Sequence, residues 1–219
     1  MAPPVFLFND INVSAITFSD PRVLDNAGKS IYVNYNKKPL FVQTHTGRAP
    51  FGLTDWDNEK FSINLTLSNK DVLDKLQELD SHIIDYAYAN SQSWFKQKFA
   101  SRDVLAELYS SPIHWSKDKV TGEINTQYDP TLKINVPYRD KEFQCIGYVK
   151  SKDGEVKPLE ISKDNIYKGA NIQVIMQCTG IWIAGKKFGC TFKVAQLMRI
   201  DDDDSGPRRL VGYSFIDEE

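Results

Sequence analysis

The side chains in this sequence that could bind a ligand are aromatic rings placed beside cations at turns and strand ends. The stretch CTGIWIAGKKFGCTFKV has the pattern of two strands joined by a tight turn, with Trp182 before the turn and Lys186 and Lys187 at or just past its tip. An exposed ring can stack on an unpaired base, at about 1–3 kcal/mol for each base, while ammonium groups hold phosphates. The alternative is that Trp182 lies over the end of the fold and both lysines are only solvated.

A second group lies in GRAPFGLTDWDNEK, which places Arg48, Phe51 and Trp56 among turn residues, where large rings need a reason to be present. The rings could plug one end of a barrel, or they could form a stacking platform beside the cation. Pro50 and Gly52 fix the backbone around Phe51. The packing role is therefore favoured for Phe51, whereas the two roles are balanced for Trp56.

A third group surrounds Trp115, which lies between His114 and Lys117 in PIHWSKDK. Strand alternation puts Trp115 on the same face as Ile113, which favours a place in the core. The combination of rings and cations recurs at other strand positions, so the candidate nucleic-acid-binding residues also include Lys193, Tyr138, Tyr148 and Lys150.

Signatures of common catalytic and metal sites are missing from the sequence. It contains no G-x-x-x-x-G-K-[ST], G-x-G-x-x-G, H-E-x-x-H or G-x-S-x-G motif, and its three histidines are not spaced from cysteine as a zinc site requires. The run Asp201 to Asp204 could hold Mg²⁺ for a nuclease. However, consecutive residues on a flexible segment cannot fix two ions in a defined geometry. We therefore predict a protein that is not an enzyme and that has no cofactor and no bound metal.

The elements that must carry these residues begin with strands. Runs rich in β-branched and aromatic residues predict strands at residues 13–18, 30–35, 40–44 and 60–67. After residue 69 the apolar spacing changes to three and four, which predicts a helix that Ser68 or Asn69 can cap. Its inward stripe is predicted to contain Val72, Leu73, Leu76, Leu79, Ile83, Ile84 and Ala87, extended by Tyr86, Trp94 and Phe95. This stripe could cover a barrel or form the surface of a homodimer.

A shorter helix follows Ser101, with Val104, Leu105 and Leu108 predicted to face inward, and strands then return. Residues 113–116 and 131–138 are predicted partners, residues 143–150 lead into the Asp153-Gly154 turn, and residues 171–183 and 188–200 form a hairpin around Gly185. Gly180 is predicted to mark a β-bulge. The buried face of the last strand is predicted to contain Phe188, Cys190, Phe192, Val194, Met198 and Ile200.

This order of elements predicts a mainly β fold, a small closed or partly open barrel with a helical insertion at about residues 68–110. Hydrophobic residues make up 41% and charged residues 26% of the chain, as in ordinary globular proteins. The sequence contains no run of 18 apolar residues, the length that a membrane-spanning helix needs. Residues 201–219 have a net charge of −5 and residues 1–200 a net charge of +3. We therefore expect a domain at residues 1–200 followed by a flexible acidic C-terminal tail at residues 201–219.

The expected location is an intracellular, reducing compartment. The first residues have too short an apolar stretch and no basic flank for a secretory signal. The three cysteines are an odd number set among strand residues, which is typical of reduced, buried thiols.

Over longer stretches the sequence resembles the single-stranded-DNA-binding proteins of nucleocytoplasmic large DNA viruses and their phage relatives with an OB-fold and an acidic tail. The stretches that carry the resemblance are GRAPFGL, KFSINLTL, SWFKQK, SRDVLAELYSSPIHWSKDKVTGE, PTLKINVPY and KGANIQVIMQCTGIWIAGKKFGCTFKVAQLMRI, which together cover roughly residues 30–200. The resemblance implies a five-stranded OB barrel, binding of single strands without sequence specificity, and no catalysis.

In the phage relatives the acidic tail ends in an aromatic residue, occupies the DNA groove when DNA is absent, and recruits replication proteins. The corresponding residues here are Asp201, Asp202, Asp203, Asp204, Phe215, Asp217, Glu218 and Glu219. This tail departs from the pattern because it is short, contains Arg208 and Arg209, and ends on Glu219 rather than on the aromatic residue.

Two functions are therefore expected. The leading one is a protein that coats and protects single-stranded DNA during replication, recombination or repair of a large DNA virus, in the host nucleus or in a cytoplasmic viral factory. The alternative is a non-enzymatic structural or adaptor barrel that recruits a polymerase or helicase through its tail. RNA stays open as a ligand, because stacking and phosphate contacts serve both nucleic acids.

Overall fold

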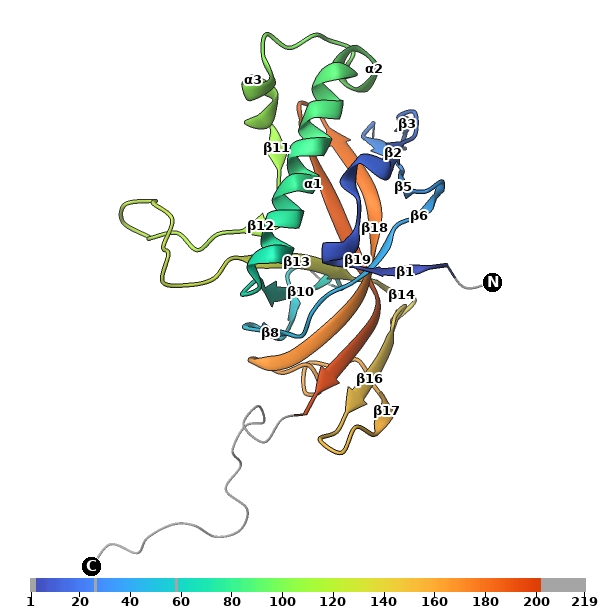
Figure 1. Ribbon diagram of the computed structural model, residues 1–219, viewed down its shortest axis with the longest axis vertical. Coiled ribbons are helices and arrows are strands. Elements are labelled where there is room, and N and C mark those ends of the chain that lie inside the picture. The colour runs from blue at the N-terminus through green and yellow to red at the C-terminus, as the bar shows by residue number, and fades with distance from the viewer. Residues whose placement is uncertain (1–2, 26, 58, 202–219) are drawn as a thin grey trace, which may run out of the picture.

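The computed structural model describes residues 3–25, 27–57 and 59–201 and consists mainly of strands (Figure 1). Of the predicted tail, only Asp201 lies within these residues, and the tail candidates from Asp202 to Glu219 lie outside them. Within the described ranges, no helix is long and apolar enough to cross a membrane. The same ranges contain no group of three or more His, Cys, Asp or Glu residues that could hold a metal ion.

The barrel is formed by β8 (Gly47–Ala49), β10 (Phe61–Thr66), β13 (Thr131–Val136), β18 (Ala170–Ala184) and β19 (Lys187–Ile200). β18 pairs antiparallel with β8 and β19, and β10 pairs antiparallel with β13. β19 meets β13 in parallel only at Lys193 and Asn135. β8 lies against β10, because a Cβ on Gly47 would be 3.0 Å from the Thr66 carbonyl oxygen. This circuit is a partly open five-stranded barrel, which confirms the expected OB-fold-like architecture.

Strand alternation divides β10 and β13 into a buried face and an outer face. Ile63 and Leu65 pair with Ile134 and Leu132 in the core, and all four side chains are buried. The residues between them in sequence point outward. The outer face is consequently polar, with Asn64 and Thr66 on β10 and Thr131, Lys133 and Asn135 on β13.

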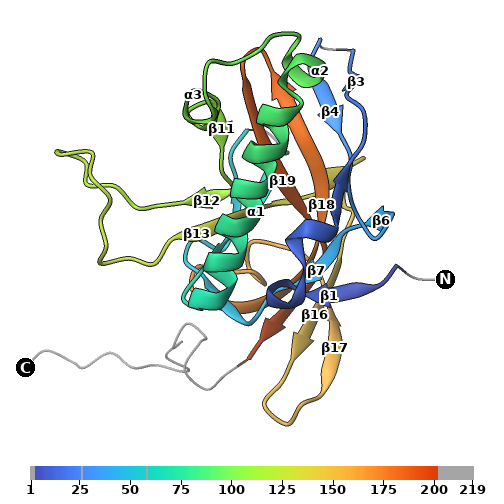
Figure 2. The same cartoon turned by 45° about the horizontal axis from the view of Figure 1, so that its top comes forward.

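The helical insertion lies between β10 and β13, as predicted. It contains α1 (Lys70–Ala89), α2 (Ser91–Phe95), α3 (Arg102–Ala106), β11 (Tyr109–Ser110) and β12 (Ile113–His114). The side chain of Asn69 caps α1 by accepting from the backbone N–H of Asp71 at 2.9 Å. α1 runs along the β18–β19 hairpin and the N-terminal segment (Figures 1 and 2). Its apolar stripe is buried in the protein's own core, so the stripe covers the barrel, and the homodimer stays a prediction.

Short elements from the N-terminal part complete the sheets. They are β1 (Val5–Leu7), the 3-10 helices η1 (Phe8–Asp10) and η2 (Val13–Ala15), β2 (Ile16–Phe18), β3 (Arg22–Val23), β4 (Lys29–Ile31), β5 (Val33–Tyr35), β6 (Lys38–Pro39), β7 (Phe41–Gln43) and β9 (Leu53–Asp55). The strand predicted at residues 13–18 therefore exists only in its second half. In α3, Val104 is exposed rather than inward, because Leu105 is the residue that enters the core.

The β18–β19 hairpin contains two irregularities. Gly180 has φ +123° at a register shift between Cys178 and Gly180, which confirms the predicted bulge. A second shift leaves Ala195 without a partner, because Ile175 pairs with Gln196 and Met176 with Val194. An unpaired residue reverses the alternation beyond it. Leu197 is consequently buried in the position expected for Met198, and the predicted inward placement of Met198 and Ile200 is wrong.

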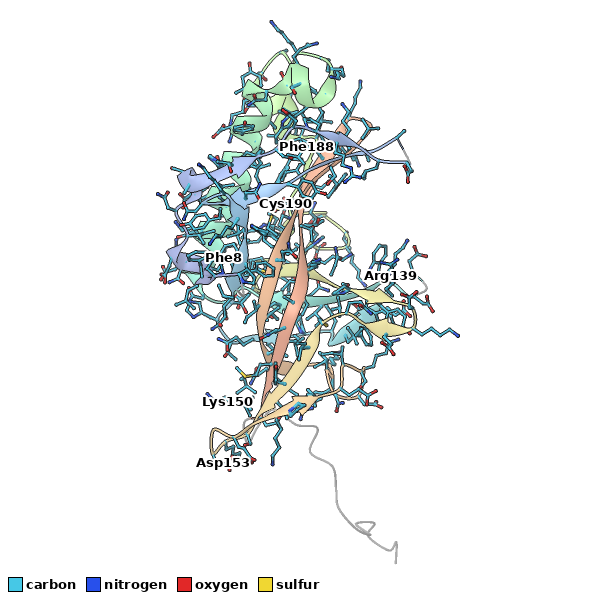
Figure 3. The ribbon with its side chains drawn as sticks, turned by 90° about the vertical axis from the view of Figure 1, so that its right-hand side faces the viewer. Phe8, Arg139, Lys150, Asp153, Phe188 and Cys190 are labelled. Atoms are coloured by element: carbon cyan, nitrogen blue, oxygen red, sulfur yellow. The ribbon has the colours of Figure 1, made fainter. Side chains whose placement is uncertain are left out.

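A small extension follows β13, and its last two strands reach the end of the molecule farthest from α2 (Figure 1). It contains β14 (Tyr138–Arg139), β15 (Glu142–Phe143), β16 (Ile146–Lys150) and β17 (Val156–Leu159). β16 pairs in parallel with β19, and the predicted Asp153-Gly154 turn joins it to β17. Figure 3 shows Lys150 and Asp153 at this end and Phe188 near the other end of the hairpin.

Candidate nucleic-acid interface

A groove of about 950 Å³ lies over the outer face of β10 and β13. Its floor consists of short polar side chains that alternation turns outward, namely Asn64, Thr66, Ser68 and Thr131. Its walls come from the turn after β8 and from residues 115–129, which we call the arm. The remaining lining residues are Arg48, Pro50, Phe51, His114, Trp115, Ser116, Gln127, Tyr128, Asp129 and Lys168.

The first wall carries Phe51, whose ring is 58% exposed. The turn is closed by the backbone N–H of Gly52, which donates to the carbonyl of Ala49 at 3.1 Å. Gly52 has φ +65°, and a Cβ there would lie 2.6 Å from the Ile166 carbonyl oxygen. Since the backbone of Gly52 packs this tightly, the ring before it points away from the barrel. The packing role expected for Phe51 is therefore wrong.

The second wall is the arm, which projects from the barrel between β12 and β13 (Figures 1 and 2). β12 ends at His114, so strand alternation does not extend to Trp115. The Trp115 ring is 37% exposed and lines the groove, and its expected place in the core is wrong. Tyr128, on the returning side of the arm, is 62% exposed.

The arm has defined internal contacts. Lys117 and Ile124 form a β-bridge across it. Near its tip, the Asp118 carboxylate accepts from the backbone N–H groups of Val120 and Thr121, both at 2.8 Å. These two hydrogen bonds lower the pKa of Asp118, because they favour the charged carboxylate. The wall that carries Trp115 and Tyr128 is thus held by its own hydrogen bonds.

Beyond the groove, the same outer face carries a stacking platform at Trp56, which is 53% exposed. The ammonium nitrogen of Lys133 lies 4.5 Å from the Trp56 ring centroid, and that of Lys60 lies 5.3 Å from it. Both cation–π contacts orient the ring against β13. The barrel-plug alternative for Trp56 is therefore wrong, because this ring lies outside the barrel.

Cations surround both the groove and the platform. Within the described residues, Arg48, Lys133 and Lys168 form no ion pair with a carboxylate. Lys193 is exposed and is the β19 partner of Asn135, next to the platform. His114 lies at the edge of the floor, and its partial burial, together with the charge of Lys133, lowers its pKa. Arg48, Lys133, Lys168 and Lys193 therefore carry positive charge on this face without an ion-pair partner among the described residues.

The hairpin tip lies elsewhere. Trp182 is half-buried, and its ring covers Gly189, where a Cβ would be 3.0 Å from a ring carbon. Phe188 behind it packs against Phe95 at 5.2 Å and Tyr109 at 5.1 Å between centroids. Lys186 and Lys187 are exposed at the turn, beside the helical insertion (Figure 1). Along β18, Trp182 is roughly 40 Å from the groove end of the strand at 3.3 Å per residue.

The other predicted residues divide between these regions. Lys117 is exposed on the arm but does not line the groove. Tyr138 packs in a ring cluster, with centroids 4.9 Å from Phe61 and 4.8 Å from Phe143. Tyr148 and Lys150 lie on β16, which pairs with the end of β19 beyond Lys193, and neither residue lines the groove. The structure thus brings together Arg48, Phe51, Trp56, Trp115 and Lys193, and separates them from Trp182, Lys186, Lys187, Tyr138, Tyr148 and Lys150.

Several residues of this face were not among the sequence candidates. Lys133 could have been found from PTLKINV, where alternation places Thr131, Lys133 and Asn135 on the face opposite the apolar residues. Tyr128 lies in a loop with turn residues on both sides, a signal resembling the one at Phe51. Lys168 has no comparable signal, because only the packing of residues 166–168 against Gly52 brings it to the groove.

Residues 53–217 match a family described as "Family of unknown function (DUF5871)". No curated protein matches the chain. Among solved structures, the chain is similar to the single-stranded DNA-binding protein from bacteriophage Enc34, at 11% identity and a TM-score of 0.46 over 90% of this chain and 96% of that chain. Its C-terminal truncation gives 11% identity and a TM-score of 0.45 over 86% and 98% of the two chains. Its complex with ssDNA gives 11% identity and a TM-score of 0.42 over 85% and 93%.

Proposed function

We propose that this chain, which belongs to the DUF5871 family of unknown function, binds single-stranded DNA along the outer face of β10 and β13. The observation that carries the proposal is a groove whose walls hold the exposed rings of Phe51, Trp115 and Tyr128 over a polar floor. Unpaired bases stack on such rings, and their edges form hydrogen bonds with such a floor. OB-type barrels bind oligonucleotides on the face of their second and third strands, which are β10 and β13 here.

The distribution of charge supports a ligand with a phosphate backbone. Arg48 and Lys168 border the groove, and Lys133 connects it with the Trp56 platform. If these three cations each contact one phosphate, the slope of log affinity against log salt is about −2, from a value near −0.7 for each contact in a single strand. The binding is then salt-sensitive and readily reversible.

The form of the face favours single strands over duplexes. In a duplex the bases are already stacked and paired, so rings such as Trp115 and Phe51 have no base face to contact. The DNA class is named because of the sequence resemblance described above, and RNA provides the same rings and phosphates. Coating of single strands in replication, recombination or repair, and an origin in a large DNA virus, are further parts of this proposal.

Partner recruitment belongs to the proposal as well. The acidic and aromatic residues that would contact a polymerase or helicase lie in residues 202–219, outside the described part of the chain. Asp201, the first acid of the run, belongs to the folded body, because it forms a two-point ion pair with Arg199 at 2.7 and 3.0 Å.

The test is a fluorescence titration with a single-stranded oligonucleotide and with the matching duplex, at low and at higher salt. We expect the protein to bind the single strand, with quenching of its tryptophan fluorescence, and to bind the duplex more weakly. The affinity for the single strand should fall as the salt concentration rises. A protein that binds neither nucleic acid at low salt would refute the proposal. An RNA strand of the same sequence, titrated in parallel, shows whether the protein also binds single-stranded RNA.

A matched pair of double variants locates the site. Lys133→Ala with Lys168→Ala removes two cations from the proposed face, and Lys186→Ala with Lys187→Ala removes two from the hairpin tip. We expect the Lys133→Ala, Lys168→Ala double variant to bind more weakly. The slope of its log affinity against log salt should be smaller in magnitude by about 1.4, at 0.7 for each phosphate contact. The Lys186→Ala, Lys187→Ala double variant should keep the affinity and the salt dependence of the wild type. The reverse result would move the site to the hairpin tip.

A further inference from the structure

The groove contains one carboxylate, and phosphate binding does not account for it. Among the charged lining residues, Asp129 is negative, whereas Arg48 and Lys168 are positive. A carboxylate beside a phosphate backbone weakens binding, because like charges repel. Its position therefore indicates a ligand group that donates hydrogen bonds.

Asp129 lies at the base of the arm, where the arm returns to β13. It lies two residues before Thr131, and the residue between them, Pro130, is buried. Asp129 is exposed and lines the groove together with Thr131, Tyr128 and Asn64. Within the described residues, the Asp129 carboxylate has no ion pair and no hydrogen bond, so its oxygen atoms are available to a ligand.

The two kinds of lining residue have separate tasks. The rings on the walls contact the flat face of any base, and Arg48 and Lys168 at the border contact the backbone. This arrangement leaves the edge of a stacked base facing the polar lining of the groove, which includes Asp129. A carboxylate accepts hydrogen bonds from exocyclic amino groups, such as N4 of cytosine. It repels the carbonyl oxygen that uracil and thymine carry at the corresponding position.

We infer that the groove discriminates between bases, favouring those with an exocyclic amino group over thymine and uracil, and that Asp129 is the residue that determines this preference. The inference rests on the proposed function, because it concerns the same groove. It differs from the expectation of binding without sequence specificity, since it assigns a base preference to one position on the strand.

The experiment compares oligodeoxycytidine and oligodeoxyuridine of equal length. The two bases differ only at the Watson–Crick edge, where cytosine has a C4 amino group and an unprotonated N3, and uracil has a C4 carbonyl and an N3–H. Stacking and backbone contacts are therefore closely matched. We expect the wild-type protein to bind the cytidine strand about five-fold or more tightly, as for a single base-edge contact. Equal affinity for the two strands would overturn the inference and leave the proposed function intact. Absence of binding to either strand would overturn both.

Two variants test the assignment to Asp129. In Asp129→Asn the amide can accept from cytosine or donate to uracil, so we expect the ratio of the two affinities to fall towards one. The affinity for the uridine strand should rise, because the repulsion is removed. Asp129→Ala should also abolish the preference. Glu123→Gln, which removes one acid from the same arm outside the groove lining, is the control and should preserve the ratio. A preference that persists in Asp129→Asn would assign it to another residue and refute the inference.

Discussion

The ammonium nitrogen of Lys133 lies 4.5 Å from the ring centroid of Trp56, so that a cation from β13 holds an exposed ring from the end of β9 against the outer face of the barrel. This contact combines the two requirements of single-strand binding, a face for stacking and a charge for the phosphate. It also connects the platform with the groove, since Thr131 and Lys133 follow one another on that face.

Replacement of Trp56 by Ala should reduce the affinity for single-stranded DNA by about 5- to 100-fold, as expected for one stacked base. Trp56→Phe should retain most of the affinity, because the ring face is preserved. The measurement is a titration followed by fluorescence anisotropy of a labelled strand. Since Trp56 is 53% exposed, thermal unfolding of both variants should match the wild type. Unchanged affinity in Trp56→Ala would remove the platform from the site.

The arm provides a second test of the groove. Trp115→Ala and Tyr128→Ala should each weaken single-strand binding by about 5- to 100-fold, because each ring is a wall of the groove. Val120 lies on the same arm, is 93% exposed and does not line the groove. Val120→Ala is therefore the matched control, and its affinity should equal that of the wild type. Equal losses in all three variants would indicate damage to the arm rather than loss of stacking.

Binding should depend on pH through His114. Partial burial and the neighbouring Lys133 lower the pKa of His114, so the imidazole is neutral at pH 7. Protonation on acidification adds a positive charge at the edge of the groove, and a bound phosphate favours that charged form. The affinity should therefore rise as the pH falls below the ordinary histidine pKa. Measured over the same range, His114→Gln should show a flatter affinity profile, and an identical profile would exclude His114 as the cause.

Stability should depend on pH through Asp80 of α1. Its carboxylate accepts from the Tyr109 hydroxyl at 2.6 Å and from the Ser111 hydroxyl, while burial raises its pKa from 3.8 to about 6. Between these values the unfolded chain loses the proton and the folded chain keeps it. The free energy of unfolding therefore falls as the pH rises from about 4 to about 6, by roughly 3 kcal/mol at most, at 1.36 kcal/mol per pKa unit.

Urea denaturation at several pH values tests this dependence. Asp80→Asn, which cannot ionise, should not show the decrease assigned to Asp80. Asp74→Asn on the exposed face of the same helix should retain it, because an exposed ion pair such as Asp74 with Lys70 contributes little to stability. Wild-type stability that is constant over this window would contradict the assignment.

Gly180 should be required for the hairpin. It has φ +123°, and a Cβ at this position would lie 2.3 Å from the carbonyl oxygen of Ile31. Gly180→Ala should therefore lower the free energy of unfolding by about 2–4 kcal/mol, through backbone strain and the clash with β4. Gly122→Ala, at φ +73° with no atom within 4 Å, should cost about 1–2 kcal/mol from the left-handed backbone alone. Similar losses at the two glycines, measured by urea denaturation, would show that the contact with β4 is unimportant.

The local patterns of the sequence determine much of the fold. The change from alternating to helical spacing after residue 69, the Asn69 cap, the turn at Gly185 and the bulge at Gly180 all follow from nearby residues, and the structure confirms them. These features depend on backbone preferences and on the periodicity of apolar residues, which are properties of short segments. For the same reason alternation predicts the outer face of β13.

The tertiary structure alone decides which aromatic rings are available to a ligand. Phe51 is exposed because Gly52 packs against residues 166–168, and Trp115 is exposed because β12 ends one residue before it. Trp182 is half-buried because Gly189, on the facing strand, leaves room for its ring. In each case the exposure depends on a neighbour or on a strand end that local spacing does not specify. The sequence alone determines that rings and cations are present, and the long-range packing of the barrel determines which of them share one surface.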